Sequence, residues 1–378
     1  MGSCILHRDK SIYVTILEIP RSIELAQGES TRRIVSSPPL EKPFPSLEPK
    51  SSKAKESVPK TSIEDLLLQK HLEFALQGIK SEYKGKWCLP RITEPHQALD
   101  KDCDGRRKIT QTISMSESSG KVAELDSMET EQPYLYQNLD SSAKTITINT
   151  SNKHIRLPPN STALLGSITS SLPTFKSQAP KFDLIIMDPP WPNRSARRKK
   201  SYGISYCHAE IKTLLSFIPA EDHLTGSGFV AVWVTNKPAF REMVIGEGGL
   251  FEQWGVEFVE EWVWLKVTVD AEPICELDSV WRKPYEILLV GRRGGVAETT
   301  VKRRVIVAVP DLHSRKPNLK VLFQELMGEE EYLGLEVFAR NLTAGWWAWG
   351  NEVLKFQGED TRKTIKYTLG YPKFHGFC

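Results

Sequence analysis

The sequence of 378 residues lacks the features that define several common protein classes. Its six cysteines are scattered and form no Cys-x-x-Cys pair or Cys/His cluster, so neither a zinc site nor a disulfide framework is expected. The chain has no apolar run of about 18 residues, and hence no predicted membrane span. No secretory signal pattern opens it. We therefore expect a protein of a reducing compartment, with no metal and no membrane partner.

Two common nucleotide-binding motifs are also missing. The chain has neither a Gly-x-Gly-x-x-Gly loop nor a P-loop that ends in Gly-Lys-Ser/Thr. The formal net charge is only +3, so any affinity for nucleic acid must come from local basic patches. No internal repeat is visible.

The chemistry is concentrated in Asp188-Pro189-Pro190-Trp191, which follow an apolar run at 182–187 typical of a buried strand. In open α/β sheets, ligands bind at the carboxyl ends of strands. Asp188 can accept a hydrogen bond from an amine, and the prolines stiffen the turn while leaving carbonyl groups free to accept. Trp191 offers a flat face. The motif predicts a socket for a heterocycle with an exocyclic amine, such as adenine. A Pro-Pro turn with a packing tryptophan is the alternative.

A later strand end carries groups that suit a cofactor. The expected strand at 333–339 contains Glu336, is followed by Arg340, and leads into an aromatic loop at 344–352 that includes Asn351. A carboxylate at a strand end can bind ribose hydroxyls, and arginine can pair with a carboxylate bidentately. These groups suit a ligand with a ribose, an adenine and an amino-acid end. An exposed Glu336 and a tryptophan cluster in the core are the open alternative.

From about residue 145, strands and helices alternate. The pattern predicts an α/β fold with a mostly parallel sheet, helices on both faces and some antiparallel pairing at one edge. We expect strands at 182–187, 228–235, 258–269, 285–290, 304–309 and 333–339, and helices at 209–217, 238–254 (broken at its glycines) and 318–327.

The first 144 residues are expected to form a separate, partly disordered region. A loose strand or hairpin pattern occupies 11–25, and polar linkers are predicted at 27–60 and 100–132. One helix is predicted at about 62–83, after a capping box at 61–64. The domain division is therefore 1–144 and 145–378.

Six motifs in order carry a resemblance. The Asp188–Trp191 motif occurs with Trp233–Asn236, Trp264–Lys266, Lys283–Glu286, His313–Pro317 and Phe338–Asn341. Together they resemble the MT-A70 family of S-adenosylmethionine-dependent adenine N6-methyltransferases, and the methyltransferase-like protein 4 branch most closely. The resemblance covers about 146–357 and implies a Rossmann-like methyltransferase domain at 145–378.

The resemblance implies site residues as well as the cofactor S-adenosyl-L-methionine. Asp188 and the Pro189 carbonyl group would hold the adenine N6 amine, with Pro190 and Trp191 completing the catalytic motif. The implied cofactor-binding residues are Ser167, Ile168, Asp188, Lys316, Glu336, Phe338, Arg340, Asn341, Asn351 and Glu352. Three of these positions depart from the family pattern. Ser167 stands where relatives commonly carry aspartate, Glu352 stands where some carry glutamine, and Asn341 lacks the two residues that usually separate it from Arg340.

The loop after the socket is the predicted nucleic-acid contact. It carries five cations, which suit phosphates, and tyrosines that can stack on a flanking base. The predicted contacts are Trp191, Asn193, Arg194, Arg197, Arg198, Lys199, Lys200, Tyr202 and Tyr206. A solvated loop or a nuclear-localisation run is the alternative. For a second basic stretch at 292–304, a solvated surface is at least as strong an interpretation.

The expected function is N6 methylation of adenine in RNA. The branch implies 2′-O-methyladenosine in a small nuclear RNA of the U2 type as the target, and N6,2′-O-dimethyladenosine as the product. The same chemistry on DNA and a non-catalytic RNA-binding scaffold are the alternatives. A nuclear location is expected, with the cytosol and a protein partner left open.

Overall fold

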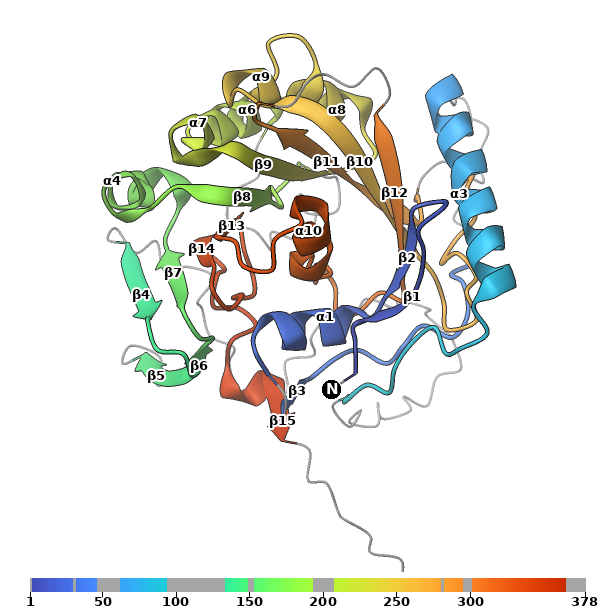
Figure 1. Cartoon of the computed structure of the whole chain (residues 1–378), viewed down its shortest axis with the longest axis horizontal. Helices are drawn as coiled ribbons and strands as arrows, with labels where there is room; N and C mark the ends of the chain where they lie inside the picture. The colour runs from blue at the N-terminus through green and yellow to red at the C-terminus, as the bar shows by residue number, and fades with distance from the viewer. Residues whose placement is uncertain are drawn as a thin grey trace, which may run out of the picture.

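The computed structural model describes residues 2–29, 32–45, 62–93, 133–148, 153–192, 207–279, 282–294 and 301–364. They form an 11-stranded sheet and two two-stranded sheets. The large sheet curves around two helices, and the remaining helices cover its outer face (Figure 1). In spatial order its strands are β1 (Ile5–Asp9), β2 (Val14–Leu17), β12 (Lys302–Ala308), β10 (Glu257–Lys266), β11 (Tyr285–Arg292), β9 (Leu224–Val234), β8 (Phe182–Met187), β13 (Gly334–Val337), β14 (Trp347–Gly350), β7 (Ser161–Leu165) and β4 (Tyr134–Asn138).

The other elements complete the layers. The small sheets are β3 (Arg32–Ile34) with β15 (Arg362–Thr364), next to a 3₁₀ turn (Glu359–Thr361), and β5 (Lys144–Ile148) with β6 (Lys153–Leu157). The inner helices are α1 (Ile19–Ala26) and α10 (Lys320–Met327). The outer helices are α3 (Ile63–Glu82), α4 (Ile168–Gln178), α6 (His208–Ser216), α7 (Ala220–His223), α8 (Pro238–Ile245) and α9 (Leu250–Gln253).

The predicted α/β class is confirmed. Most pairings in the large sheet are parallel, including those of β8 with β9 and β13, and of β13 with β14. Antiparallel pairing was expected at one edge and is found at both edges and also in the interior. Strand β11 runs antiparallel between β9 and β10 in the interior, and the β1–β2 and β4–β7 pairs are antiparallel at opposite edges. Strand β11 returns beside β10 without a crossover helix, as only an antiparallel neighbour can.

Strand β8 shows why the sheet is covered on both faces. Ile185 and Met187 pack into the outer core with α4 and α6, whereas Leu184 and Ile186 pack into the inner core with α1 and α10. Successive side chains of a strand point to opposite faces, so a strand with apolar residues on both faces must be buried on both. This places the residue after Met187 at the sheet edge between the two layers.

The expected boundary at residue 145 is not where the sheet begins. Strand β2 pairs in parallel with β12, and all four of its residues are buried. Strand β4 forms the opposite edge beside β7. The predicted linker at 27–60 is also structured in part, since the Leu40 carbonyl accepts from the Val269 amide at 3.0 Å. Residues 46–60 and 100–132 lie outside the described residues.

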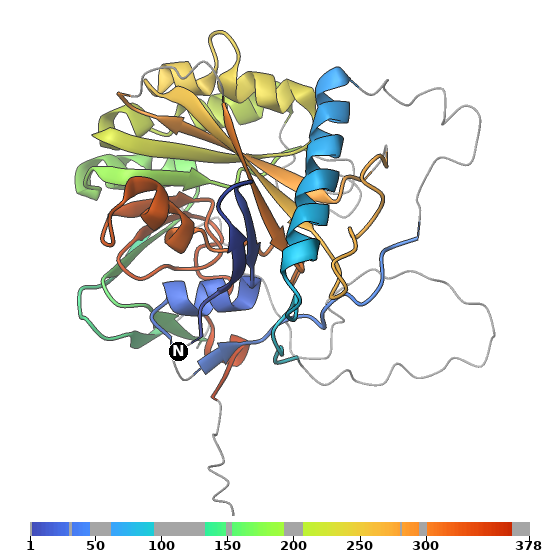
Figure 2. The ribbon, with the colours of Figure 1, turned by 45° about the vertical axis from the view of Figure 1, so that its right-hand side comes forward.

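The predicted helix at 62–83 is confirmed as α3. Its cap is Ser62, whose Oγ accepts from the Asp65 amide at 3.1 Å, one residue later than the predicted capping box. Helix α3 runs along the outer face beside β12 and β2 (Figure 2), with Leu72 and Ile79 fully buried beneath it. In the described part of the chain, no helix is long and apolar enough to cross a membrane.

Candidate active site

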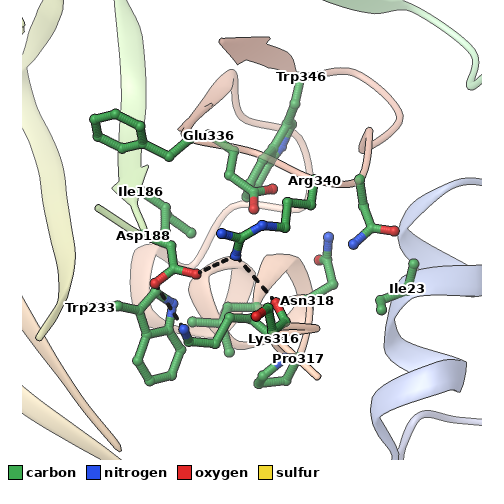
Figure 3. A pocket seen from close by; sticks show the side chains of 14 residues that line it. Ile23, Ile186, Asp188, Trp233, Lys316, Pro317, Asn318, Glu336, Arg340 and Trp346 are labelled. Carbon is green, nitrogen blue, oxygen red and sulfur yellow. Dashed lines mark hydrogen bonds and ion pairs between the residues drawn. The ribbon is translucent and has the colours of Figure 1, made fainter. Parts of the chain in front are cut away.

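A pocket lies where the carboxyl ends of β8, β9 and β13 meet the loop that follows β12. The space between its lining residues, about 540 Å³, includes open solvent. Asp188 comes directly after β8, Trp233 lies near the end of β9, and Arg340 follows β13. Lys316 reaches the pocket from the loop after β12, and Ile23 comes from α1 (Figure 3). This is the edge at which the strand-end rule places a ligand.

Alternating charges connect across the pocket. Lys316 Nζ lies 2.8 Å from Asp188 Oδ1 and 3.0 Å from Glu286 Oε2. Arg340 lies 3.2 Å from Asp188 Oδ2 through its terminal nitrogen and 2.7 Å from Glu352 Oε2 through Nε. A cation therefore faces each oxygen of the Asp188 carboxylate (Figure 3). The two ion pairs fix this carboxylate at the pocket wall.

The charges around Lys316 shift its pKa and that of its partner. Burial disfavours the ammonium group, but the Asp188 and Glu286 carboxylates outweigh it and raise the pKa of Lys316. Burial likewise opposes ionisation of Glu286, but Lys316 and Lys266 outweigh it and lower its pKa to about 2. This part of the pocket therefore keeps its charges at neutral pH.

Glu336 behaves differently. Burial raises its pKa to about 7, the neighbouring Asp188 carboxylate adds to the rise, and Arg340 and Lys316 oppose it. The side chain lines the pocket opposite Lys316 (Figure 3). The Glu336 carboxyl group is therefore partly protonated near neutral pH. It lies where the sequence predicts a contact with ribose hydroxyls.

The structure brings most of the predicted cofactor residues together. Asp188, Lys316, Glu336, Phe338, Arg340 and Asn341 all line the pocket. Ser167 instead caps α4, its Oγ accepting from the Ser170 amide at 3.1 Å, and Ile168 is buried in the outer core. Asn351 and Glu352 are not among the lining residues. Asn351 is exposed, and Glu352 pairs with Arg340 and Lys355 beside the pocket.

Trp191 does not offer an open flat face. It is only 8% exposed, and its ring centroid lies 4.6 Å from that of Phe240. Its Nε1 donates to the Trp233 carbonyl at 2.7 Å, and its amide donates to the Pro189 carbonyl at 2.8 Å. Pro190 is half-buried in the same turn. The indole therefore has core partners at its ring and its nitrogen, and its contact with the base stays a prediction.

The aromatic loop expected at 344–352 contains a strand, β14, at its centre. Trp347 and Trp349 lie on β14, and both are buried, as is Trp346 just before it. Trp349 stacks on Phe175 at 4.1 Å between centroids and donates to Ser171 Oγ at 2.7 Å. The core interpretation of the cluster is correct, although Trp346 also lines the pocket.

The predicted nucleic-acid loop cannot be compared with the structure. Asn193, Arg194, Arg197–Lys200, Tyr202 and Tyr206 lie outside the described residues. The second basic stretch is tied internally: Arg303 pairs with Glu261 at 2.7 Å and Arg304 with Glu260. These pairs support its interpretation as ordinary surface.

Several residues in or beside the pocket escaped sequence reasoning. Glu286 and Lys266 lie beside the pocket, where Glu286 pairs with Lys266 and with Lys316. Both belong to motifs that carried the resemblance, yet they had no assigned role; a charge near one end of an apolar strand was the available signal. Ile23 and Asn318 have no such signal, because nothing local ties α1 to the pocket. Across the described ranges, no three His, Cys, Asp or Glu side chains gather as a metal site requires.

The donor set fits a ligand with a nucleoside and an amino-acid end. Glu336 can accept from ribose hydroxyls, and Asp188, Lys316 and Arg340 present both signs of charge for an ammonium and a carboxylate. Ile186 and Phe338 supply apolar wall. A curved, mostly parallel sheet with this pocket at its carboxyl edge defines a Rossmann-like α/β enzyme of nucleotide-like ligands.

Comparison with known proteins identifies the family. The MT-A70 family model matches residues 182–352. The chain is 38% identical over 367 residues to the N6-methyladenosine RNA methyltransferase MTA1 of Cryphonectria parasitica, covering 93% of this chain and 92% of that protein. It is 35% identical to the human N(6)-adenine-specific methyltransferase METTL4 (79% and 66% covered) and 26% identical to a DNA N6-methyl methyltransferase of Caenorhabditis elegans (71% and 75%). The chain belongs to the MT-A70 family and is a methyltransferase.

Proposed function

We propose that the protein is an S-adenosyl-L-methionine-dependent N6-adenine methyltransferase acting on RNA, with 2′-O-methyladenosine in a small nuclear RNA as its target. The observation that carries the proposal is Asp188 at the end of β8, held between Lys316 and Arg340 and facing the pocket that contains Glu336. The printed names of the MTA1 and METTL4 relatives support adenine N6 as the acceptor. The proposed product is N6,2′-O-dimethyladenosine, and the proposed location is the nucleus.

The pocket residues divide into two groups by the ligand they would hold. S-adenosyl-L-methionine supplies an electrophilic methyl group on a sulfonium sulfur. Glu336 would accept from its ribose hydroxyls, and Lys316 and Arg340 would hold its carboxylate while remaining paired with Asp188. Asp188 faces the same space and is left to bind the amine of the incoming adenine.

Asp188 acts on the adenine amine by orientation rather than by removing a proton first. The N6 lone pair is delocalised into the ring, so the amine is a poor nucleophile. A carboxylate oxygen and the Pro189 carbonyl oxygen, which each retain an acceptor site, can take the two N6 hydrogens and favour a pyramidal nitrogen. The cations at 2.8 and 3.2 Å hold the Asp188 carboxylate in place, which suits an acceptor that positions the amine.

Methyl transfer to matched oligonucleotides tests the substrate. With labelled S-adenosylmethionine, we expect at least about tenfold higher kcat/KM on RNA carrying 2′-O-methyladenosine than on unmodified RNA or deoxyadenosine DNA, since about 1.4 kcal/mol of differential binding suffices. The DNA alternative, which the name of the worm relative favours, predicts the opposite order. Absence of cofactor binding to the full chain would instead support the scaffold, whereas binding without transfer would indicate a missing partner or the wrong sequence context.

Glu336 should make cofactor binding depend on pH. Its pKa of about 7 means that it is mostly protonated at pH 6 and mostly ionised at pH 8. Only the ionised form accepts from two hydroxyl groups, so the Kd for S-adenosylmethionine should be about tenfold higher at pH 6 than at pH 8. Calorimetry on wild type and Glu336→Gln measures this. The variant should bind weakly with a flatter profile, and an equal slope in both proteins would assign the pH dependence to another group.

Protonation of Glu336 also affects the stability of the protein without cofactor. The folded-state pKa lies above the ordinary value of 4.5, so between about pH 4.5 and 7 the folded state binds more protons than the unfolded state. The contribution of Glu336 to stability is therefore lost as the pH rises through 7.

A further inference from the structure

We propose that Arg91, which lies outside the family match, is a positioning residue for methyl transfer. It fixes the loop at 309–316 that brings Ser314 and Lys316 to the pocket. This inference rests on the proposed function, because the effect of Arg91 is expressed through Lys316. The family model begins at residue 182, so Arg91 would be a contribution of the N-terminal region to the active site.

Arg91 belongs to a buried cluster of four charges, which we call the clamp: Glu18, Arg91, Asp311 and Arg315. Each side chain is no more than 1% exposed. Arg91 Nε lies 3.7 Å from Glu18 Oε1, and its terminal nitrogen lies 3.9 Å from Asp311 Oδ1. Asp311 in turn pairs with Arg315 at 2.7 Å. The clamp thus joins the β2–α1 connection, the segment after α3 and the pocket loop.

The guanidinium group of Arg91 holds the start of the loop. Its two terminal nitrogens donate to successive carbonyls, that of Pro310 at 2.8 Å and that of Val309 at 2.9 Å, just after β12 ends. A planar fork with fixed N–H directions can bridge two neighbouring carbonyls. A lysine ammonium is a single point and cannot hold both in the same way.

The far end of the loop is held by the same region. Arg315 donates to the Val35 carbonyl at 2.9 Å, and the Ser37 amide donates to Asp311 Oδ1 at 2.9 Å. Between these ties Ser314 has a φ of 68°, a conformation that side chains rarely adopt without support. Its carbonyl accepts from Arg340 at 3.4 Å, and Lys316 follows two residues later.

The clamp is poorly built for stability alone. Removing four charges from water costs several kcal/mol per ion, and separations of 3.7 and 3.9 Å are too long for direct hydrogen bonds. Within the described residues, Glu18 Oε1, Arg91 Nε and Arg315 Nε have no hydrogen-bond partner. What the cluster does achieve is a fixed backbone at 309–316, which sets the direction of Lys316 toward Asp188.

A double-mutant cycle tests this role. We expect Arg91→Lys to lower kcat about tenfold at saturating substrates, because small misplacements of reacting groups are costly. In a Lys316→Met background the same change should lower kcat by less than about twofold, since residues that act through one another are not additive. The matched control is Arg156→Lys, which alters a half-buried Arg–Glu pair with Glu29 away from this loop and should leave kcat unchanged.

The outcomes separate the proposal from a general loss of structure. An equal fold-loss in both backgrounds, or an equal loss in the Arg156 variant, would overturn it, and melting curves identify any variant that fails to fold. Hydrogen exchange gives a second readout that needs no activity. The amides at 311–316 should exchange faster in Arg91→Lys while those of β8 and β13 do not change. Were wild type inactive on every oligonucleotide, the proposed function would fail, but unchanged exchange at 311–316 would still count against the clamp.

Discussion

The Asp188→Asn variant is expected to lose about 10³-fold in kcat for methyl transfer, the scale seen when one well-placed polar group is removed from an active site. The amide keeps the shape of the carboxylate but places a donor where two cations and an amine all need an acceptor. Orientation of N6 is lost, and Lys316 and Arg340 lose the carboxylate that they share, although each keeps its glutamate partner. The Kd for S-adenosylmethionine should change by less, because Glu336 and the apolar wall stay in place.

Asp183 provides the matched control for that experiment. It lies on the same strand, β8, but its oxygens accept from the Leu333 amide at 3.0 Å and Thr225 Oγ1 at 3.1 Å, away from the pocket. Asp183→Asn should therefore keep wild-type kcat despite some loss of stability. Single-turnover transfer by the two variants and wild type, with cofactor affinity measured in parallel, makes the comparison. Near-normal single-turnover rates in Asp188→Asn would remove Asp188 from the mechanism.

The second large effect is structural. Trp349→Ala should destabilise the protein by about 4 kcal/mol, the range for emptying a large aromatic site in a packed core. Trp349 is fully buried, stacks on Phe175 of α4 with an interplanar angle of 8°, and donates to Ser171. Strand β14 also pairs with β13, which carries Glu336. We therefore expect the loss of cofactor binding to accompany the loss of stability.

Trp349→Phe separates packing from the hydrogen bond. It keeps an aromatic ring against Phe175 but removes the donor to Ser171, so it should cost only about 1–2 kcal/mol. Urea denaturation monitored by circular dichroism measures both variants. A Trp349→Ala protein within about 1 kcal/mol of wild type would mean that β14 is not packed as described.

Local patterns predicted the centre of the molecule well. The apolar run at 182–187 identified β8, and the strand-end rule then placed Asp188 at the ligand edge without further information. The same rule placed Glu336 and Arg340 in one pocket although 148 residues or more separate them from Asp188 in the sequence. Periodicity and a serine cap were sufficient for α3.

What the sequence did not predict depends on distant partners. The sequence cannot tell whether a tryptophan ring contacts a ligand or another ring. Trp191 contacts Phe240 and Trp349 contacts Phe175, and each phenylalanine comes from a separate helix. Arg340 was predicted to pair with a ligand carboxylate, but Asp188 and Glu352 already pair with it in the structure. The clamp likewise could not be predicted from the sequence, because its four residues come from three distant segments.

The pairing of β2 with β12 also constrains how the protein is made. Val14 pairs with Val305, so at ribosomal rates of about 5–20 residues per second the β1–β2 hairpin waits some 15–60 s for its neighbour. During that interval its apolar side chains, including Ile16, which is fully buried in the finished protein, have nothing to cover them. The N-terminal hairpin therefore lacks its sheet neighbour until synthesis has passed Val305, and completion of the sheet is a late event of synthesis.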